Sequence, residues 1–283
     1  MPIALALVAA IVYGASDFLG GLASRRTATI GVVIWSQAVG LALLTLVVPA
    51  FGGDATAADV RWGALCGVAG ALAIVALYRG LAVGTMGIVS PLSAVLGASI
   101  PVLYGLIFRG EHPGWFAAAG ILAALAAVVL VSAQPGVREP RPQFFPPGIP
   151  EALVAGVGFG LYFIALAQTR AGAGMVPLLA ARATSVALLL AGAAAFGGIA
   201  GVRLARPAVG LVVVCGALDV SANVLYVVAA HNALLALVAV LTSLYPAATV
   251  ALAAIALRER LGRLQWIGVA LALGGAVAIS SGS

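Results

Sequence analysis

The chain has 283 residues, 64% of them hydrophobic and only 8% charged, and its mean hydropathy is +1.20. A soluble domain carries about 25% charged residues, so this composition excludes a soluble protein and indicates one that lies in the lipid bilayer. The net charge of +6 comes from arginines spread over the loops, whereas a nucleic-acid-binding face would cluster them. We therefore predict a multi-pass protein of the plasma (inner) membrane that binds no nucleic acid.

The apolar stretches predict helices. Lipid allows only helices and closed barrels, because every backbone polar group must be paired internally. The stretches run on without the alternation of a barrel strand, and a spanning helix needs about 20 residues. We predict an all-α polytopic membrane protein with ten transmembrane helices, over residues 3–24, 28–50, 61–83, 86–108, 113–133, 149–170, 174–197, 208–230, 232–257 and 263–281.

A proline-rich segment divides the helices into two groups of five. Its prolines forbid a regular helix, so we predict a first repeat over 1–133, a linker over 134–148 and a second repeat over 149–283. Five helices per half make the second half enter the membrane from the opposite side, and such inverted repeats are typical of secondary transporters. Four identical pairs share one offset of 148 residues: Tyr78/Tyr226, Glu111/Glu259, Gly120/Gly268 and Ser132/Ser280.

Two stretches carry a resemblance to a known family. They are "YGASDFLGGLASRR" at 13–26 and "YPAATVALAAIALRERLGRLQWIG" at 245–268, in which Pro246 precedes Glu259 at the family's spacing. Together with the doubled five-helix unit, they resemble the EamA-type ten-helix members of the drug/metabolite transporter superfamily. The first half departs from the pattern, since Ala98 stands where the family has proline. The resemblance implies a transporter and not an enzyme, but it leaves the substrate open.

Two aspartates lie inside predicted helices. Each costs roughly 2.5–3.5 kcal/mol at a helix centre, so a buried role is expected to offset the cost. Asp17 shares a helical face with Gly14 and Gly21, which let another helix approach or leave space for a ligand. Asp219 belongs to a polar stripe that must face protein or water: Cys215, Asp219, Asn223 and Tyr226. One aspartate is expected to bind a cation, a proton or an amine, and Asp219 is the better candidate. The alternative for Asp219 is that it only locks helix packing, and the alternative for Asp17 is that it lies at the membrane interface near Arg25 and Arg26.

Arg182 has three interpretations. It forms an ion pair with Asp219, binds a substrate carboxylate, or extends to the membrane surface. Helices that contain proline are further candidates for lining a substrate site, because proline leaves a backbone carbonyl inside the membrane without its helical hydrogen bond. Besides Asp17, Arg182 and the stripe residues Asp219, Asn223 and Tyr226, the candidate substrate-binding or coupling residues are Trp35, Gln37, Tyr78, Ser90, Ser93, Thr242 and Tyr245.

The sequence lacks the residues that several kinds of catalysis and cofactor binding require. The chain has no lysine, so it has neither a phosphate-binding loop nor a lysine Schiff base. The sequence has no H-E-x-x-H motif and no Cys/His cluster that would suggest a metal site. It also shows no arrangement of a nucleophile with its base. We expect no catalytic residues, no metal and no cofactor. Cys66 and Cys215 lie in predicted helices, and we interpret them as small buried apolar residues.

These observations favour a secondary transporter that exports a small metabolite such as an amino acid by alternating access, possibly coupled to protons. The partners expected are the small-molecule substrate, the bilayer and, if the chain is not a monomer, a second copy in a homodimer. A multidrug or hydrophobic-cation exporter is the alternative, favoured if the site is acidic and aromatic rather than balanced by Arg182. A non-transporting membrane scaffold is the alternative of another class.

The orientation stays open. Loops after odd-numbered helices hold ten arginines and loops after even-numbered helices hold three. The positive-inside rule then places both termini outside the cytoplasm, whereas the family resemblance implies termini inside.

Overall fold

A computed structural model describes residues 2–51, 53–108, 114–132, 146–195, 199–231, 242, 244–258 and 262–282. Within these ranges every regular element is a helix, which confirms the predicted all-α class. Among the described residues, six helices are long and apolar enough to cross a membrane: α1, α2, α3, α6, α7 and α9.

The described helices follow the prediction closely. They are α1 (Pro2–Ser24), α2 (Thr29–Phe51), α3 (Ala57–Val83), α4 (Met86–Phe108), α5 (Trp115–Ser132), α6 (Ile149–Leu166), the 3₁₀ turn η1 (Ala171–Ala173), α7 (Val176–Ala195), the short α8 (Ile199–Val202), α9 (Arg206–His231), α11 (Tyr245–Leu257) and α12 (Arg263–Gly282). Ten of these described α-helices have between 13 and 27 residues. Residues 232–241 of the predicted ninth helix and 134–145 of the predicted linker lie outside the described residues.

Two helix ends differ from the prediction by four residues, and polar side chains lie at both. Helix α3 begins four residues earlier than predicted, because Thr56 and Asp59 form a capping box that pairs the first backbone N–H groups. Helix α6 ends at Leu166 instead of residue 170. There the Thr169 hydroxyl donates to the carbonyl oxygen of Leu166 at 2.7 Å and satisfies one of the last carbonyls of the helix.

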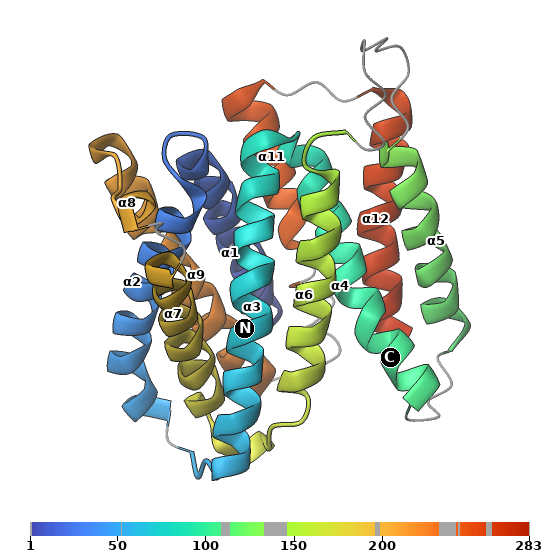
Figure 1. Ribbon diagram of the computed structural model, residues 1–283. Coiled ribbons are helices and arrows are strands. Elements are labelled where there is room, and N and C mark those ends of the chain that lie inside the picture. Colours follow the sequence, from blue (N-terminus) through green and yellow to red (C-terminus); the bar gives the residue numbers. More distant parts are fainter. Residues whose placement is uncertain are drawn as a thin grey trace.

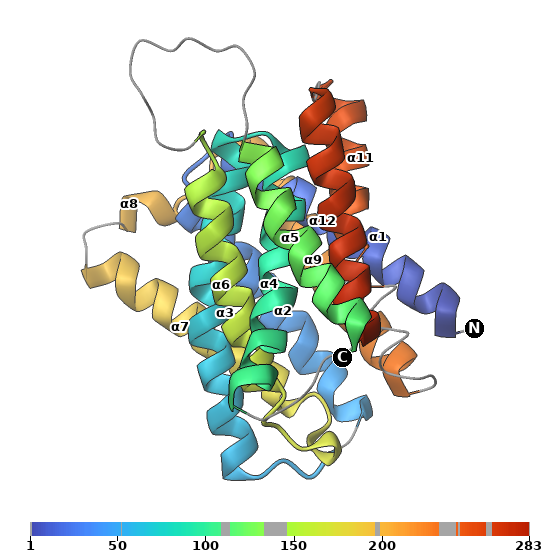
Figure 2. The ribbon, with the colours of Figure 1, turned by 90° about the vertical axis from the view of Figure 1, so that its right-hand side faces the viewer.

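The helices form one bundle in which sequence-distant segments are neighbours. Helix α3 packs against α6 and α7, α1 against α9 and α11, and α2 against α7 and α9. Helix α4 contacts α6, α11 and α12, and α5 packs on α12 at one edge of the bundle, opposite the edge formed by α2, α7 and α8 (Figure 1). Figure 2 shows α5 and α12 side by side in front of the other helices.

The two ends of the bundle differ in charge. One, the arginine-rich end, joins α1 to α2, α3 to α4, α7 to α9 and α11 to α12, and carries Arg25, Arg26, Arg79, Arg203, Arg206, Arg258 and Arg263. The other, the terminal end, lies toward the two chain ends (Figure 1) and carries Arg61 and Arg170 among the described residues. The predicted imbalance of arginines between the loops is therefore also present in the fold.

The two ends also differ in packing. The largest buried apolar cluster lies wholly in the half of the bundle next to the arginine-rich end, with Phe18, Leu77, Leu81, Met86, Val89, Ile149 and Val212 among its members. Two smaller clusters, Ala6 with Ala229 and Cys66 with Ala165 and Ala181, lie in the terminal half, where Leu44 and Met175 are also fully buried. The largest apolar cluster of the described chain thus lies toward one end.

Candidate functional site

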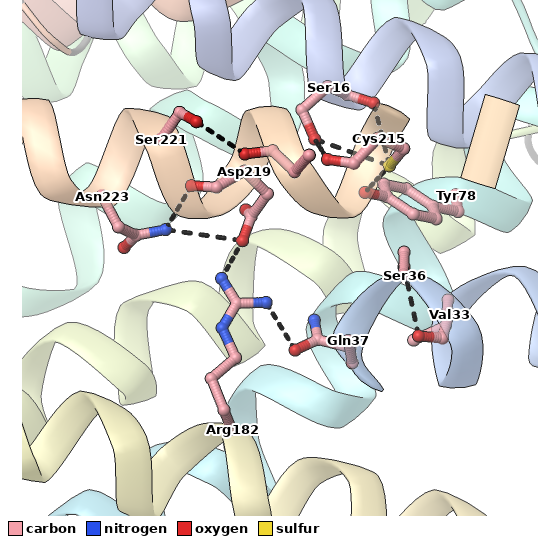
Figure 3. Close-up of polar contacts among 11 residues, drawn as sticks. Ser16, Val33, Ser36, Gln37, Tyr78, Arg182, Cys215, Asp219, Ser221 and Asn223 are labelled. Atoms are coloured by element: carbon pink, nitrogen blue, oxygen red, sulfur yellow. Dashed lines mark hydrogen bonds and ion pairs between the residues drawn. The ribbon is translucent and has the colours of Figure 1, made fainter. Parts of the chain in front are cut away.

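A polar group occupies the middle of the bundle (Figure 3). Arg182 of α7 reaches toward α9 and forms an ion pair with the carboxylate of Asp219 through Nη2. Its Nη1 donates to Oε1 of Gln37, from α2, at 2.6 Å. Asn223 donates from Nδ2 to the Asp219 carbonyl oxygen at 2.7 Å and lies 3.4 Å from its Oδ2. Three helices therefore meet in one charge-balanced group.

The geometry explains how a membrane interior tolerates these charges. Asp219 lies at the centre of α9, where an unpaired carboxylate is costly, and the guanidinium neutralises it. Gly40 lies beside the pair, and a Cβ there would lie 3.1 Å from Cγ2 of Val220 and in ordinary contact with Nη1 of Arg182 at 3.6 Å. The side chains of Arg182 and Asp219 keep 11% and 22% exposure, so the pair is not sealed. Of the three interpretations of Arg182, the structure shows the ion pair.

A second polar cluster lies one turn along α9, at Cys215. Its thiol lies 3.1 Å from the hydroxyl of Tyr78 on α3 and 3.5 Å from that of Ser16 on α1. The Ser16 hydroxyl also donates to the Cys215 carbonyl oxygen at 3.0 Å. Gly20 admits the Tyr78 ring, which the Cβ of any larger residue would overlap. Cys215 is buried as expected, but the sequence offered no signal for its two hydroxyl neighbours.

Asp17 is placed differently from Asp219. It is half-buried on α1. Its carboxylate has no hydrogen-bond or ion-pair partner within the part of the chain that the structure describes. The glycines beside it serve close packing: Gly14 lies against the backbone of α11, and Gly21 lies against Leu81 and Met86.

Other predicted lining residues lie apart from Arg182. Trp35 is 47% exposed and donates from Nε1 to the carbonyl oxygen of Val202 at 2.9 Å, at the arginine-rich end. Ser90 and Ser93 are buried in α4, where Ser93 donates to the Ser90 carbonyl oxygen at 2.9 Å. The hydroxyl of Ser90 is buried and unpaired within the described chain, as is that of Thr242.

Tyr226 and Tyr245, the two other tyrosines among the predicted site residues, are half-buried. Tyr245 packs edge-on against Tyr13, with ring centroids 6.4 Å apart. Tyr226 packs against the small cluster of Ala6 and Ala229, toward the terminal end. A substrate-binding role for these residues stays a prediction. Among the described residues, no three His, Cys, Asp or Glu side chains gather where they could hold a metal ion.

Comparisons with known proteins define the class. The model of the EamA-like transporter family matches residues 146–281. This match, together with the long apolar helices, indicates a multi-pass membrane transporter and not an enzyme. This match supports, over the C-terminal half of the chain, the family resemblance that the sequence predicted.

The fold has a counterpart among solved structures. One of them, described only as "Crystal structure of protein", has a TM-score of 0.60 and 19% identity, and the similarity covers 95% of each chain. At that identity the match supports the fold alone. The search of curated proteins found no match.

Proposed function

We propose that the chain is a secondary transporter that exports a small polar metabolite such as an amino acid by alternating access. In this proposal the transport machinery consists of two inverted five-helix repeats, residues 1–133 and 149–283, with residues 134–148 as linker. The observation that carries the proposal is the charge-balanced group of Arg182 and Asp219 in the middle of the bundle.

The helix contacts support the repeat. If α1 to α5 correspond in order to α6, α7, α9, α11 and α12, exchanging the halves turns the contact of α1 with α9 into that of α6 with α3. It likewise turns α1 with α11 into α6 with α4, and α2 with α9 into α7 with α3. The exchange leaves three contacting pairs unchanged: α2 with α7, α4 with α11 and α5 with α12. A transport site between such repeats is expected near the membrane midplane, and the position of Asp219 at the centre of α9 supports this assignment.

The ion pair suits a zwitterionic cargo. A guanidinium binds a carboxylate through parallel hydrogen bonds, and the partial exposure of Arg182 leaves it within reach of a ligand. The carboxylate of an amino acid then replaces Asp219 on Arg182, while the ammonium group of the same molecule binds Asp219. Both buried charges keep a partner through this exchange, which avoids the cost of leaving either one unpaired.

The packing difference supports alternating access. A transporter of this kind opens its central site to one side of the membrane at a time. The large apolar cluster separates the Arg182–Asp219 group from the arginine-rich end, whereas the described terminal half holds two small clusters. In our proposal this arrangement is the state closed toward the arginine-rich end, and transport requires that cluster to separate.

Arg182 argues against the alternatives. A site for hydrophobic cations would be acidic and aromatic, but here the guanidinium neutralises Asp219. A scaffold would gain nothing from a charged pair that remains partly exposed inside the membrane.

The test uses purified protein in proteoliposomes with an internal pH dye and a panel of amino acids, amines and cationic dyes. We expect flux of amino acids, reduced at least tenfold by Arg182→Gln or Asp219→Asn, a factor that corresponds to about 1.4 kcal/mol of binding free energy. Ser221→Ala is the matched control, because Ser221 lies on the exposed face of α9 and bonds only within its own helix. Flux of cationic dyes alone would select the drug exporter, and no flux from folded protein would favour the scaffold.

A further inference from the structure

The arginine-rich end carries three guanidinium groups that have no carboxylate partner in the described chain. They belong to Arg26, Arg203 and Arg206, which are all exposed, whereas the ion pairs between described residues use other arginines. Arg25 differs from these three, because its guanidinium donates to two carbonyl oxygens at the C-terminal end of α3. The positive charge of the three exposed arginines is therefore left for a partner outside the described chain.

Two loops bring these arginines together. The Thr27 hydroxyl, next to Arg26, accepts a hydrogen bond from the backbone N–H of Ala205 at 3.4 Å. Ala205 directly precedes Arg206 and follows Arg203 by two residues. Because consecutive Cα atoms are about 3.8 Å apart, the Cα atoms of Arg26 and Arg206 cannot be more than about 15 Å apart. Two extended arginine side chains can bridge that span with one phosphate group between them.

Close packing of α8 on α2 fixes the backbone that carries the arginines. A Cβ at Gly31 would lie 2.5 Å from the carbonyl oxygen of Gly201, so α8 lies directly against the first turn of α2. One turn further along α2, the indole Nε1 of Trp35 donates to the carbonyl oxygen of Val202, at the end of α8. The α1–α2 turn and the α8–α9 loop therefore form one continuous surface.

This surface lies at the level of the lipid headgroups. Arg206 is the first residue of a helix long and apolar enough to span the membrane, and Arg26 lies three residues before another, which begins at Thr29. A helix that crosses the hydrocarbon core has its ends in the headgroup region. Trp35, which is 47% exposed, agrees with this depth, since tryptophan is enriched at membrane–water interfaces.

Toward the membrane interior, the face of α9 that carries Arg206 is apolar and open. Val209 and Val213, three and seven positions after Arg206, share its helical face and are 43% and 46% exposed. Beside Val209, a Cβ at Gly210 would have no atom within 4 Å. A phospholipid fits this arrangement, because its phosphate meets the arginines while its acyl chains lie on α9. A soluble anion would gain nothing from the apolar face.

We propose that Arg26, Arg203 and Arg206 form a binding site for the phosphate group of an anionic phospholipid, whose acyl chains lie along the exposed face of α9. A guanidinium binds a phosphate through parallel hydrogen bonds. A headgroup with a net negative charge is favoured over a zwitterionic one, whose own ammonium group compensates the phosphate. The bound lipid joins the α1–α2 turn to a loop of the other half of the chain. This inference does not depend on the proposed transport function.

The site is tested by native mass spectrometry of the full chain, purified in detergent, with added phosphatidylglycerol or phosphatidylcholine of the same acyl chains. We expect phosphatidylglycerol to bind at least tenfold more tightly. Arg26→Gln and Arg206→Gln should each weaken its binding about fivefold, which corresponds to about 1 kcal/mol per arginine. Arg61→Gln, the control on an exposed arginine of the terminal end, should leave the affinities for both lipids unchanged.

Each other result overturns the proposal. Equal affinity for the two lipids, or an affinity for phosphatidylglycerol that both variants keep, means that these arginines bind no headgroup. Equal weakening in Arg61→Gln means that the net charge of the chain, and not this site, attracts the lipid.

A competition experiment on the wild type distinguishes a lipid from a soluble phosphate ester and needs no variant. We expect glycerol 1-phosphate, at the same concentration as phosphatidylglycerol, to leave the lipid bound. Displacement of the lipid would mean that the arginines bind a soluble phosphate ester and that the apolar face of α9 contributes nothing, which overturns the lipid site.

Discussion

The two ends of the α3–α6 pair are held together in different ways. At the arginine-rich end, Arg79 forms an ion pair with Glu151 at 3.3 Å, but Arg79 is 67% exposed. At the terminal end, the side chain of Asp59 is only 2% exposed and accepts hydrogen bonds from the backbone N–H and the guanidinium of Arg170, each at 2.9 Å. Thr56 adds two further hydrogen bonds to the same carboxylate.

The difference matches the packing of the bundle. The arginine-rich end has the large apolar cluster and needs little from its ion pair. At the terminal end a polar network joins the loops, in which the Asp59 carboxylate is buried and Arg170 is 53% exposed. In that network Arg170 also donates to the Asp54 carbonyl oxygen, and the Asp54 N–H donates to the Gly172 carbonyl oxygen at 2.9 Å. Apolar packing therefore stabilises one end, and hydrogen bonds to charged groups stabilise the other.

The largest effect is expected from overfilling the apolar end. Gly20→Val should lower the free energy of unfolding by about 3 kcal/mol, the upper part of the range for overpacking. The added atoms would overlap the Tyr78 ring, which its contact with Cys215 keeps from moving away. Denaturation in detergent measures the change. Gly210→Val is the control, because no atom lies within 4 Å of a Cβ at that position. Equal losses in both variants would contradict the close contact.

A smaller effect is expected from the polar end. Arg170→Ala should cost about 2 kcal/mol, as expected for hydrogen bonds to a charged group, because the buried Asp59 loses its cation but keeps Thr56. The same denaturation assay measures it, with Arg61→Ala as the control on an exposed arginine of the same end. A loss in Arg170→Ala no larger than in Arg61→Ala would mean that the network adds no stability.

The smallest effect is expected at the exposed ion pair. Arg79→Ala should cost less than about 1 kcal/mol, since exposed pairs are weak and salt screens them. The difference from wild type should shrink further as the salt concentration rises. If this variant loses as much stability as Arg170→Ala, then burial does not explain the contrast between the two ends.

Sequence reasoning located most elements and several members of the site. Helix lengths and caps are local, and even the early start of α3 had a sequence signal in Thr56 and Asp59. The polar stripe of α9 was predicted correctly as an inward face, since helical spacing assigns residues to a face. Trp35 shows the limit: the sequence offered it with Gln37 as a candidate site residue, but its indole lies at the arginine-rich end near α8.

The sequence by itself determined that this is an all-α membrane protein with two carboxylates in its spans, because lipid accepts only long apolar helices and polar residues stand out among them. Only the tertiary structure decided which carboxylate is neutralised. Arg182 lies 37 residues from Asp219, and helical spacing reveals the face of a residue but not the helix that faces it. The packing of α7 against α2 and α3, and of α9 against α1 and α2, brings Arg182 to Asp219 and not to Asp17.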